Sequence, residues 1–487
     1  MMKKKELLFI LFWSSVNIVT AQTPVLACLI AIFQHSLVWA KLFKKNVFDA
    51  FKLYIIFTTI SLEISAFVVG VDNGSIYCYF NVPILHGILA LSEISIIFLS
   101  LVIYAKRIEA KSNGKFIYRW MFFFMISGIL ASIISLVIND NNILAFGYYP
   151  RVSILEWLNF ASRFCLFQAT VIFIYVFNRY NELSRICQEL LVCLVFSSVF
   201  FAIIGFKGYY GDENTMLSSL AMGFTPCLLL MYDKKYSNTN INKITILAGL
   251  VTIVSSFRYP SVIGSKWYLV ILFSVVCLIY KYSGIKSSKY LLVFFILFLL
   301  LVPLVSSFVF EILGRDSYIA FKLNQSLQVL DVAGAESYDD YLAGMGGSPL
   351  FRFDEIHNIF IEYTKKPYFA IIGKGFGGTT LHYTDLLPWE TYHGAFSVDQ
   401  VKMNAYYAMH ESIATVFLRH GFLGVFFICV LLIRLLKSLI ISKWAVLATL
   451  FLFFYWSYGG SFSIGVIAVI LTVYKLDTKQ ILNQCQR

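Results

Sequence analysis

The chain has 487 residues, of which 59% are hydrophobic and only 14% are charged. A soluble domain carries about 25% charged and about 45–50% apolar residues, so this composition excludes a soluble enzyme, a disordered protein and a nucleic-acid-binding module. The net charge of +12 comes from 39 Lys and Arg residues against 27 Asp and Glu residues. In a membrane protein such an excess reflects basic residues in cytoplasmic loops, so the placement of these residues decides what it means.

Apolar residues fall in runs of roughly 15–25, which is long enough for a helix to cross a bilayer. The runs predict an all-α polytopic membrane protein with about 12–14 transmembrane helices. The first two runs are short and form either one kinked span or a tight hairpin. The first run, preceded by Lys3–Lys5, also resembles a signal peptide with Ala21 at its cleavage site. The expected spans lie near 7–21, 24–40, 51–71, 82–105, 117–138, 153–178, 187–205, 215–232, 244–258, 267–281, 290–310, 411–433, 444–458 and 460–474.

Basic residues divide unevenly between the two sides of this topology. With the N-terminus in the cytoplasm, 26 Lys and Arg residues fall in inner loops and tails, and four fall in short outer loops. This asymmetry predicts that both termini are cytoplasmic. It also accounts for the net charge without a polyanionic partner such as nucleic acid.

Four ionisable residues interrupt the apolar runs, namely Glu63, Glu93, Arg163 and Arg419. In this topology each lies about 12–18 Å below the outer face, at 1.5 Å per helical residue. Ionisable residues at such depth are rare and mark a functional site or a structural ion pair. We therefore expect either two ion pairs or one outward-facing polar cavity, with His420 beside Arg419 in the same layer.

Two cations flank a tight outer hairpin, Arg258 at the end of one span and Lys266 at the start of the next. The planar guanidinium of Arg suits phosphate oxygens, so the pair is a candidate anion site. The alternative is an interfacial Arg that extends its charge to water.

A hydrophilic stretch, 311–410, breaks the pattern of short loops and carries twelve acidic and seven basic residues. The topology puts it outside the cell membrane, and loops of this length usually have a function. Phe353, Ile356, Phe360 and Tyr363 recur at helical spacing, so 351–364 predicts an amphipathic helix that lies on the membrane or covers a cavity. The chain therefore divides into a transmembrane bundle (1–310), this extracytoplasmic loop, and C-terminal transmembrane helices with a cytoplasmic tail (411–487).

A glycine-rich stretch follows that helix, with Gly373, Gly375 and Gly377 at alternate positions. Glycine allows sharp turns and brings backbone N–H groups close to a ligand. The spacing is not that of a P-loop or a dinucleotide fingerprint. Both a ligand-binding turn and a plain turn remain open.

The long loop returns to the membrane at His410-Glu411-Ser412, and Gly421 and Gly424 follow within the next span. The positive end of a helix dipole disfavours imidazolium, so His410 at this position is a candidate proton acceptor. Glu411 and Ser412 are equally suited to capping the helix, and the two glycines to close helix packing.

Taken in order, these elements resemble the bacterial O-antigen polymerase and O-antigen ligase family of membrane glycosyltransferases. The resemblance covers about 250–435. The Ser-Arg-Gly-like element of the family has its counterpart in Ser256-Phe257-Arg258, with Phe257 inserted and Tyr259 in place of Gly. The next elements are Arg352, Pro367 and Gly373-Lys374-Gly375-Phe376-Gly377, and the last are His410, with Glu411 in place of the usual Asn, and Gly421-Phe422-Leu423-Gly424.

This resemblance implies a GT-C-like fold in the bacterial inner membrane and a glycan donor carried on undecaprenyl pyrophosphate. It implies that the pyrophosphate or substrate is bound by Arg258 and Arg352, with Lys266, Arg163, Arg419, Gly373, Gly375 and Gly377. His410 is the expected general base, with Glu411 second. Transfer is expected to be independent of metals and cofactors, since the long loop has no acidic D-x-D motif. Membrane lipids, a chain-length regulator and a flippase are the expected partners.

Three functions in surface polysaccharide or lipopolysaccharide biosynthesis fit these elements. A polymerase transfers a growing glycan to the next lipid-linked repeat unit, and we favour it because the match is divergent. A ligase transfers the same donor to lipid A–core. A flippase for lipid-linked oligosaccharides suits many spans and buried charges, but the chain has no internal repeats.

Overall fold

The computed structural model describes the N-terminal helices, parts of 161–193, and most of the chain between 347 and 449, together with the last helix. The described residues are 4–20, 23–68, 83–84, 89–105, 112–138, 161, 165, 168–174, 179–190, 193, 347–384, 389, 396, 398–407, 409, 412–438, 441–442, 444–445, 447–449 and 462–486. Arg163, Arg258, Lys266, His410 and Glu411 lie outside these residues, as do seven of the expected spans either wholly or in large part.

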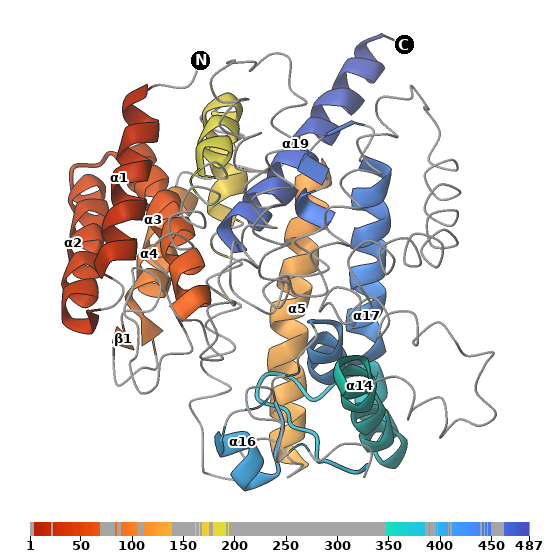
Figure 1. Ribbon diagram of the computed structural model, residues 1–487. Coiled ribbons are helices and arrows are strands. Elements are labelled where there is room, and N and C mark those ends of the chain that lie inside the picture. The colour runs from red at the N-terminus through yellow and green to blue at the C-terminus, as the bar shows by residue number, and fades with distance from the viewer. Residues whose placement is uncertain are drawn as a thin grey trace, which may run out of the picture.

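The N-terminal part is a group of helices, shown on the left and centre of Figure 1. They are α1 (Lys4–Thr20), α2 (Pro24–Phe43), α3 (Val47–Val68), α4 (Leu91–Tyr104) and α5 (Ser112–Val137). The first two apolar runs form two helices that pack against each other, which is the hairpin alternative and not a single kinked span.

The expected span at 82–105 was too long at its N-terminal end. Pro83–Ile84 (β1) pairs antiparallel with Leu89–Ala90 (β2), and the helix begins only at Leu91. Pro83 has no N–H to donate and is tolerated at the first residue of a strand. Apolarity alone did not distinguish this short hairpin from the helix that follows it.

The C-terminal part contains five further helices in the described residues. They are α14 (Gly347–Lys365), α15 (Pro367–Ile372), α16 (Val398–Met403), α17 (Ser412–Ser438) and α19 (Phe462–Cys485). The helix expected at 351–364 is confirmed as α14. Both ends of the chain lie at the top of Figure 1, and α14 and α16 lie at the opposite end of the molecule.

Within the described residues, three helices are long and apolar enough to cross a membrane: Val25–Phe43, Lys115–Val137 and Ile413–Ser438. The apolar helix Leu91–Ile103 is shorter. The described part of the chain is therefore mostly helical and contains three candidate membrane-spanning helices.

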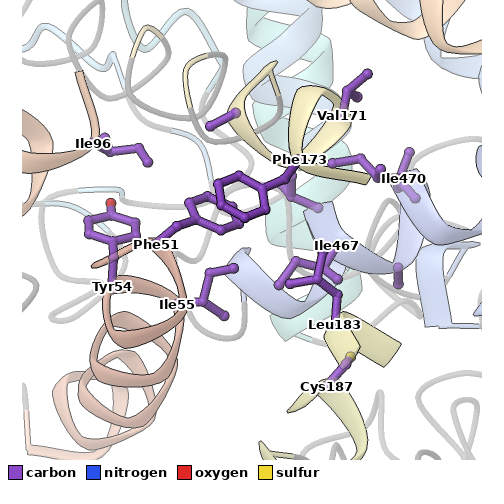
Figure 2. Close-up of a cluster of buried hydrophobic side chains, with 14 of the residues drawn as sticks. Phe51, Tyr54, Ile55, Ile96, Val171, Phe173, Leu183, Cys187, Ile467 and Ile470 are labelled. Atoms are coloured by element: carbon purple, nitrogen blue, oxygen red, sulfur yellow. The ribbon is translucent and has the colours of Figure 1, made fainter. Parts of the chain in front are cut away.

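A hydrophobic core joins the N-terminal helices to the end of the chain (Figure 2). The ring of Phe51 on α3 stacks on that of Phe173, with centroids 4.6 Å apart and an interplanar angle of 14°. Leu183 is buried in the same cluster, and so is Ile467, which belongs to α19. Segments more than 400 residues apart thus share one core.

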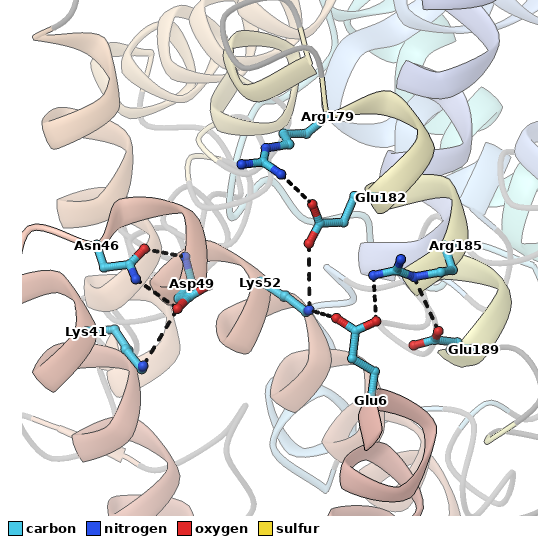
Figure 3. A network of polar contacts seen from close by, with 9 residues as sticks. All are labelled: Glu6, Lys41, Asn46, Asp49, Lys52, Arg179, Glu182, Arg185 and Glu189. Atoms are coloured by element: carbon cyan, nitrogen blue, oxygen red, sulfur yellow. Dashed lines mark hydrogen bonds and ion pairs between the residues drawn. The ribbon is translucent and has the colours of Figure 1, made fainter. Parts of the chain in front are cut away.

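A network of ion pairs ties α1 and α3 to residues 179–190 (Figure 3). Glu6 pairs with Lys52 and also with Arg185, whose Nη2 lies 2.5 Å from Glu6 Oε2. Glu182 pairs with Arg179 at 2.9 Å. Lys52 lies near one loop of the expected cytoplasmic side, Arg179 and Arg185 lie in another, and the network brings them together.

Replacing Glu6 by Gln is expected to lower the melting temperature of the purified protein. Lys52 and Arg185 are only 16% and 18% exposed, and a hydrogen bond to a charged group contributes about 1.5–3 kcal/mol. Differential scanning fluorimetry in detergent checks this. The control is Lys41→Gln, whose pair with Asp49 is exposed and 3.6 Å long, and which should change little. Equal shifts in the two variants would contradict the prediction.

Candidate functional site

Helix α14 turns a polar face toward the protein. Asp354, Asn358 and Glu362 follow one another at intervals of four residues, and all three are fully buried. Ile356 and Phe360 of the expected apolar stripe are instead exposed, by 39% and 50%. Tyr363, at the edge of that stripe, is buried, so the stripe as a whole does not face the protein, and its expected position on the membrane stays a prediction.

The first buried carboxylate, Asp354, is surrounded by donors. Its oxygens accept hydrogen bonds from Asn358 Nδ2 at 3.0 Å, from Trp389 Nε1 at 2.7 Å and from the Thr384 hydroxyl. The ring of His382 stacks on Trp389 with centroids 4.7 Å apart. These contacts fasten the segment after the glycine stretch to α14.

The second buried carboxylate, Glu362, holds the side chain of Lys374. Lys374 Nζ lies 2.9 Å from Glu362 Oε1, and neither side chain is exposed. Lys366, whose side chain is 32% exposed, approaches the same oxygen at 3.4 Å, and the Tyr383 hydroxyl donates to Oε2. We call these four residues the Glu362 cluster.

Helix α17 is broken at Gly421, where φ is 61° and ψ is −159°. The break frees carbonyl groups of the preceding turn, which need other donors. The Tyr363 hydroxyl lies 2.7 Å from the carbonyl oxygen of Phe417 and 2.9 Å from that of Leu418. The backbone N–H of Lys374 also donates to Leu418 O, at 2.8 Å, and that of Gly375 donates to Arg419 O, at 3.0 Å. The glycine-rich turn, residues 373–378, therefore completes the hydrogen bonding of the broken helix.

The other side of the glycine-rich turn packs against α5. Ser132 Oγ lies 2.8 Å from Phe376 O, and the N–H of Phe376 donates to Gly128 O at 3.4 Å. A Cβ at Gly375 would lie 2.2 Å from the backbone nitrogen of Ser132, and one at Gly128 would lie 2.3 Å from the Phe376 ring. Backbone and ring leave no room for a larger residue at either position.

His420 fills the space between α5 and α17. Its Nδ1 lies 3.1 Å from Ser127 Oγ, and its ring packs edge-on against Phe124 and Phe376. A Cβ at Gly424 would lie 2.4 Å from that of His420. The expected close helix packing is seen at Gly421, where a Cβ would lie 2.6 Å from the Ile371 carbonyl oxygen of α15, whereas Gly424 makes room for His420 of its own helix.

The backbone contacts of the glycine-rich turn do not show the expected ligand-binding role of Gly373, Gly375 and Gly377. The N–H groups of residues 373–376 and of Gly378 donate to carbonyl groups of the protein. A Cβ at Gly373 would lie 2.3 Å from the backbone carbon of Arg419. The close approaches at Gly373 and Gly375 are therefore made to α17 and α5, and ligand binding by these glycines stays a prediction.

Of the other expected site residues, the structure describes Arg352 and Arg419, both partly exposed. Arg352 lies in the first half of α14, and Arg419 lies two residues before the break in α17, with its backbone against Gly373 and Gly375. Glu93 is buried on α4. Glu63 lies in α3, but its side chain is outside the described residues, so the pairing of this charge layer stays a prediction.

The residues that sequence reasoning missed are Asp354, Asn358, Glu362, Tyr383 and Trp389. The first three had a usable pattern, because polar residues at i, i+4 and i+8 of one helix must share a face. In the described part of the chain, no group of three or more His, Cys, Asp or Glu side chains could hold a metal ion. In this region buried hydrogen bonds, the Glu362–Lys374 ion pair and a hydrophobic cluster join α14, the glycine-rich turn and α17.

No family model matches the sequence, and no curated protein or solved structure matches it either. The functional assignment therefore rests on the residues of this chain and on their arrangement.

Proposed function

We propose that the protein is a polysaccharide polymerase of the bacterial inner membrane, with a GT-C-like fold of about 12–14 spans. It transfers a growing O-antigen- or capsule-type glycan from undecaprenyl pyrophosphate to the next lipid-linked repeat unit. One observation carries this proposal. The glycine-rich turn packs directly on α17 beside Arg419, and α17 begins two residues after His410.

The contacts between α14, the glycine-rich turn and α17 support one site toward the end of the molecule opposite the two termini. Arg352 belongs to α14, which contacts both α15 and α17. The Glu362 cluster and the hydrogen bonds to Leu418 and Arg419 hold this assembly rigid. A rigid frame is what catalysis by positioned charges requires, because the donors then need no reorganisation during the reaction.

The proposed chemistry is a single displacement at the anomeric carbon of the donor. His410 accepts the proton of an acceptor hydroxyl as its oxygen attacks that carbon, with Glu411 as the second candidate for the base. The bond between the anomeric carbon and the pyrophosphate oxygen breaks, and undecaprenyl pyrophosphate leaves. Arg258 and Arg352, assisted by Lys266, Arg163 and Arg419, stabilise the charge that develops on the leaving group.

A strain deleted for the gene tests the function through the size ladder of its surface polysaccharide. Under the polymerase proposal the ladder collapses to one repeat unit on its normal acceptor. Loss of all attached glycan, with long chains on undecaprenyl pyrophosphate, would instead identify a ligase. An unchanged ladder would reject both transferase functions.

Complementation of that strain with His410→Ala is expected to restore the protein to the membrane but not the ladder. The loss should be at least about 100-fold in polymer, which is the low end of general acid–base contributions. The matched control is His357→Ala, which removes a partly exposed His of α14 in the same loop and should keep the ladder. Polymer at the normal length and amount with His410→Ala would remove His410 from its assigned role.

A further inference from the structure

The outward face of α14 carries large apolar side chains, whereas its buried face carries charged and polar residues beside Phe351, Ile359 and Tyr363. Asp354, Asn358 and Glu362 point into the protein, whereas Ile356 and Phe360 are exposed. A helix beside water shows the reverse arrangement, with its charged residues outward. The arrangement in α14 is the one expected where the surroundings are as apolar as the side chains, as they are in lipid.

Helices α15 and α17 continue this exposed apolar surface. Tyr368 and Ile371 of α15 are exposed, the latter by 62%, and so is Phe422 of α17. Helix α15 lies directly on α17, because a Cβ at Gly421 would be 2.6 Å from the carbonyl oxygen of Ile371. Ile371 therefore sits at the level of Gly421.

That level lies well inside the candidate span of α5. Gly128 comes nine residues before Val137, which is ~14 Å along this helix at 1.5 Å per residue. In α17 the break at Gly421 comes eight residues after Ile413, the first residue of its candidate span. The two helices are antiparallel, since Arg434 lies over Phe116 while His420 contacts Ser127. The glycine-rich turn touches both helices at these points. The hydrocarbon core is about 30 Å thick, so the turn reaches toward its middle.

The backbone of the turn is enclosed and hydrogen-bonded by protein, as a position at this depth in a bilayer requires. Irregular backbone is tolerated within a bilayer only where protein surrounds it and satisfies its polar groups. Residues 373–380 are all buried, and the N–H groups of Lys374, Gly375 and Phe376 donate to α17 and α5. The turn is thus shielded from lipid, while the side chains of α14 and α15 that precede it are not.

We propose that α14 and α15 are seated in the bilayer, on the side where α16 lies, with Ile356, Phe360, Tyr368 and Ile371 in contact with the acyl chains of bulk lipid. The segment 347–378 is then a re-entrant hairpin of the membrane domain and not part of an extramembrane loop. This inference requires that α17 spans the membrane, and it is independent of the reaction proposed above.

Two lysines at the end of α14 are compatible with this position. Lys366 pairs with Glu362 at 3.4 Å, and Lys365 Nζ lies 3.7 Å from the centroid of the Tyr383 ring. One ammonium group is therefore held by a carboxylate and the other by the face of an aromatic ring. Long, flexible Lys side chains allow such contacts beside an apolar surface.

Photocrosslinking of the full-length protein tests the proposal. Benzoylphenylalanine replaces Phe360 or Ile371, and also Phe426 of α17, which is 61% exposed and serves as the lipid-facing reference. Lys402 of α16, also exposed, is the control outside the membrane. Each variant is purified, checked for a monodisperse gel-filtration peak, placed in nanodiscs of synthetic phosphatidylethanolamine and phosphatidylglycerol, irradiated, and analysed by mass spectrometry.

The expected result is adducts with the synthetic phospholipids at 360 and 371, at yields like that at 426, and none at 402. The proposal is overturned if only 426 forms lipid adducts, or if 360 and 371 crosslink to protein or to a copurified polyprenyl lipid instead. Absence of lipid adducts at 426 as well overturns it too, because α17 would then not face lipid.

Discussion

Replacing Lys374 by Met is expected to prevent the protein from accumulating in folded form. Lys374 and Glu362 are both fully buried and lie 2.9 Å apart, so the substitution leaves a carboxylate inside the protein without its closest cation. Breaking a buried pair from one side costs about 3–5 kcal/mol, which is a large part of the stability of a typical domain. Fluorescence-detected size-exclusion chromatography of a tagged protein measures the folded fraction.

The double variant Lys374→Met with Glu362→Gln separates the ion pair from simple packing. Removal of both charges of a buried pair is often close to neutral, and Gln keeps an acceptor for the Tyr383 hydroxyl. We therefore expect the double variant to recover most of the monodisperse peak that each single variant loses. Losses that simply add in the double variant would show that the two charges do not compensate each other.

Lys366→Met is the matched control for this pair. Lys366 approaches the same Glu362 oxygen at 3.4 Å, but its side chain is 32% exposed. Its side chain is not enclosed by the protein, so its removal should lower the folded fraction only slightly. A loss equal to that of Lys374→Met would mean that burial does not decide the strength of this pair.

Within the described residues the sequence was sufficient to predict the long apolar helices and α14, but not α15, α16 or the polar residues on the buried face of α14. Helical spacing of Phe353, Ile356 and Phe360 correctly indicated α14, because periodicity depends only on the geometry of the helix. The usual inference that the apolar face is the buried one assumes water on the other side. Where a helix lies beside a membrane, hydrophobicity no longer distinguishes lipid from protein interior. The buried Asp354 and Glu362 could be assigned only once their partners on distant segments were visible.

Long-range contacts also explain why the break in α17 could not be predicted. Gly421 stands in an apolar helical run, and a single Gly there is compatible with an unbroken helix that packs closely. The break is stabilised by donors from Tyr363 and Lys374, which lie about 50 residues earlier in the chain. By contrast, the run 82–105 contained a local signal against a continuous helix, namely Pro83. The apolar residues of the run nevertheless led to the prediction of a single span.

Replacing Gly375 by Ala is expected to disrupt the assembly of the turn with α5 and α17. The φ of Gly375 is 78°, a left-handed backbone conformation that costs a residue with a Cβ about 1–2 kcal/mol. The new Cβ would also lie 2.2 Å from the backbone nitrogen of Ser132 and 2.5 Å from Gly128 O. Overpacking of this kind adds about 1–3 kcal/mol or more. The melting temperature and the folded fraction in detergent should both fall strongly.

Second-site substitutions test whether the loss at Gly375 comes from these particular neighbouring atoms or from a general sensitivity of the region to mutation. At Gly375 the closest atoms are backbone of α5, so Ser132→Ala should not rescue Gly375→Ala. At Gly128 the three closest atoms all belong to the Phe376 ring, so Gly128→Ala should be harmful alone and recover substantially with Phe376→Ala. That second change introduces a cavity, which limits the recovery. Rescue at Gly375 by Ser132→Ala, or none at Gly128 by Phe376→Ala, would mean that the turn does not lie between α5 and α17 in the way these distances require.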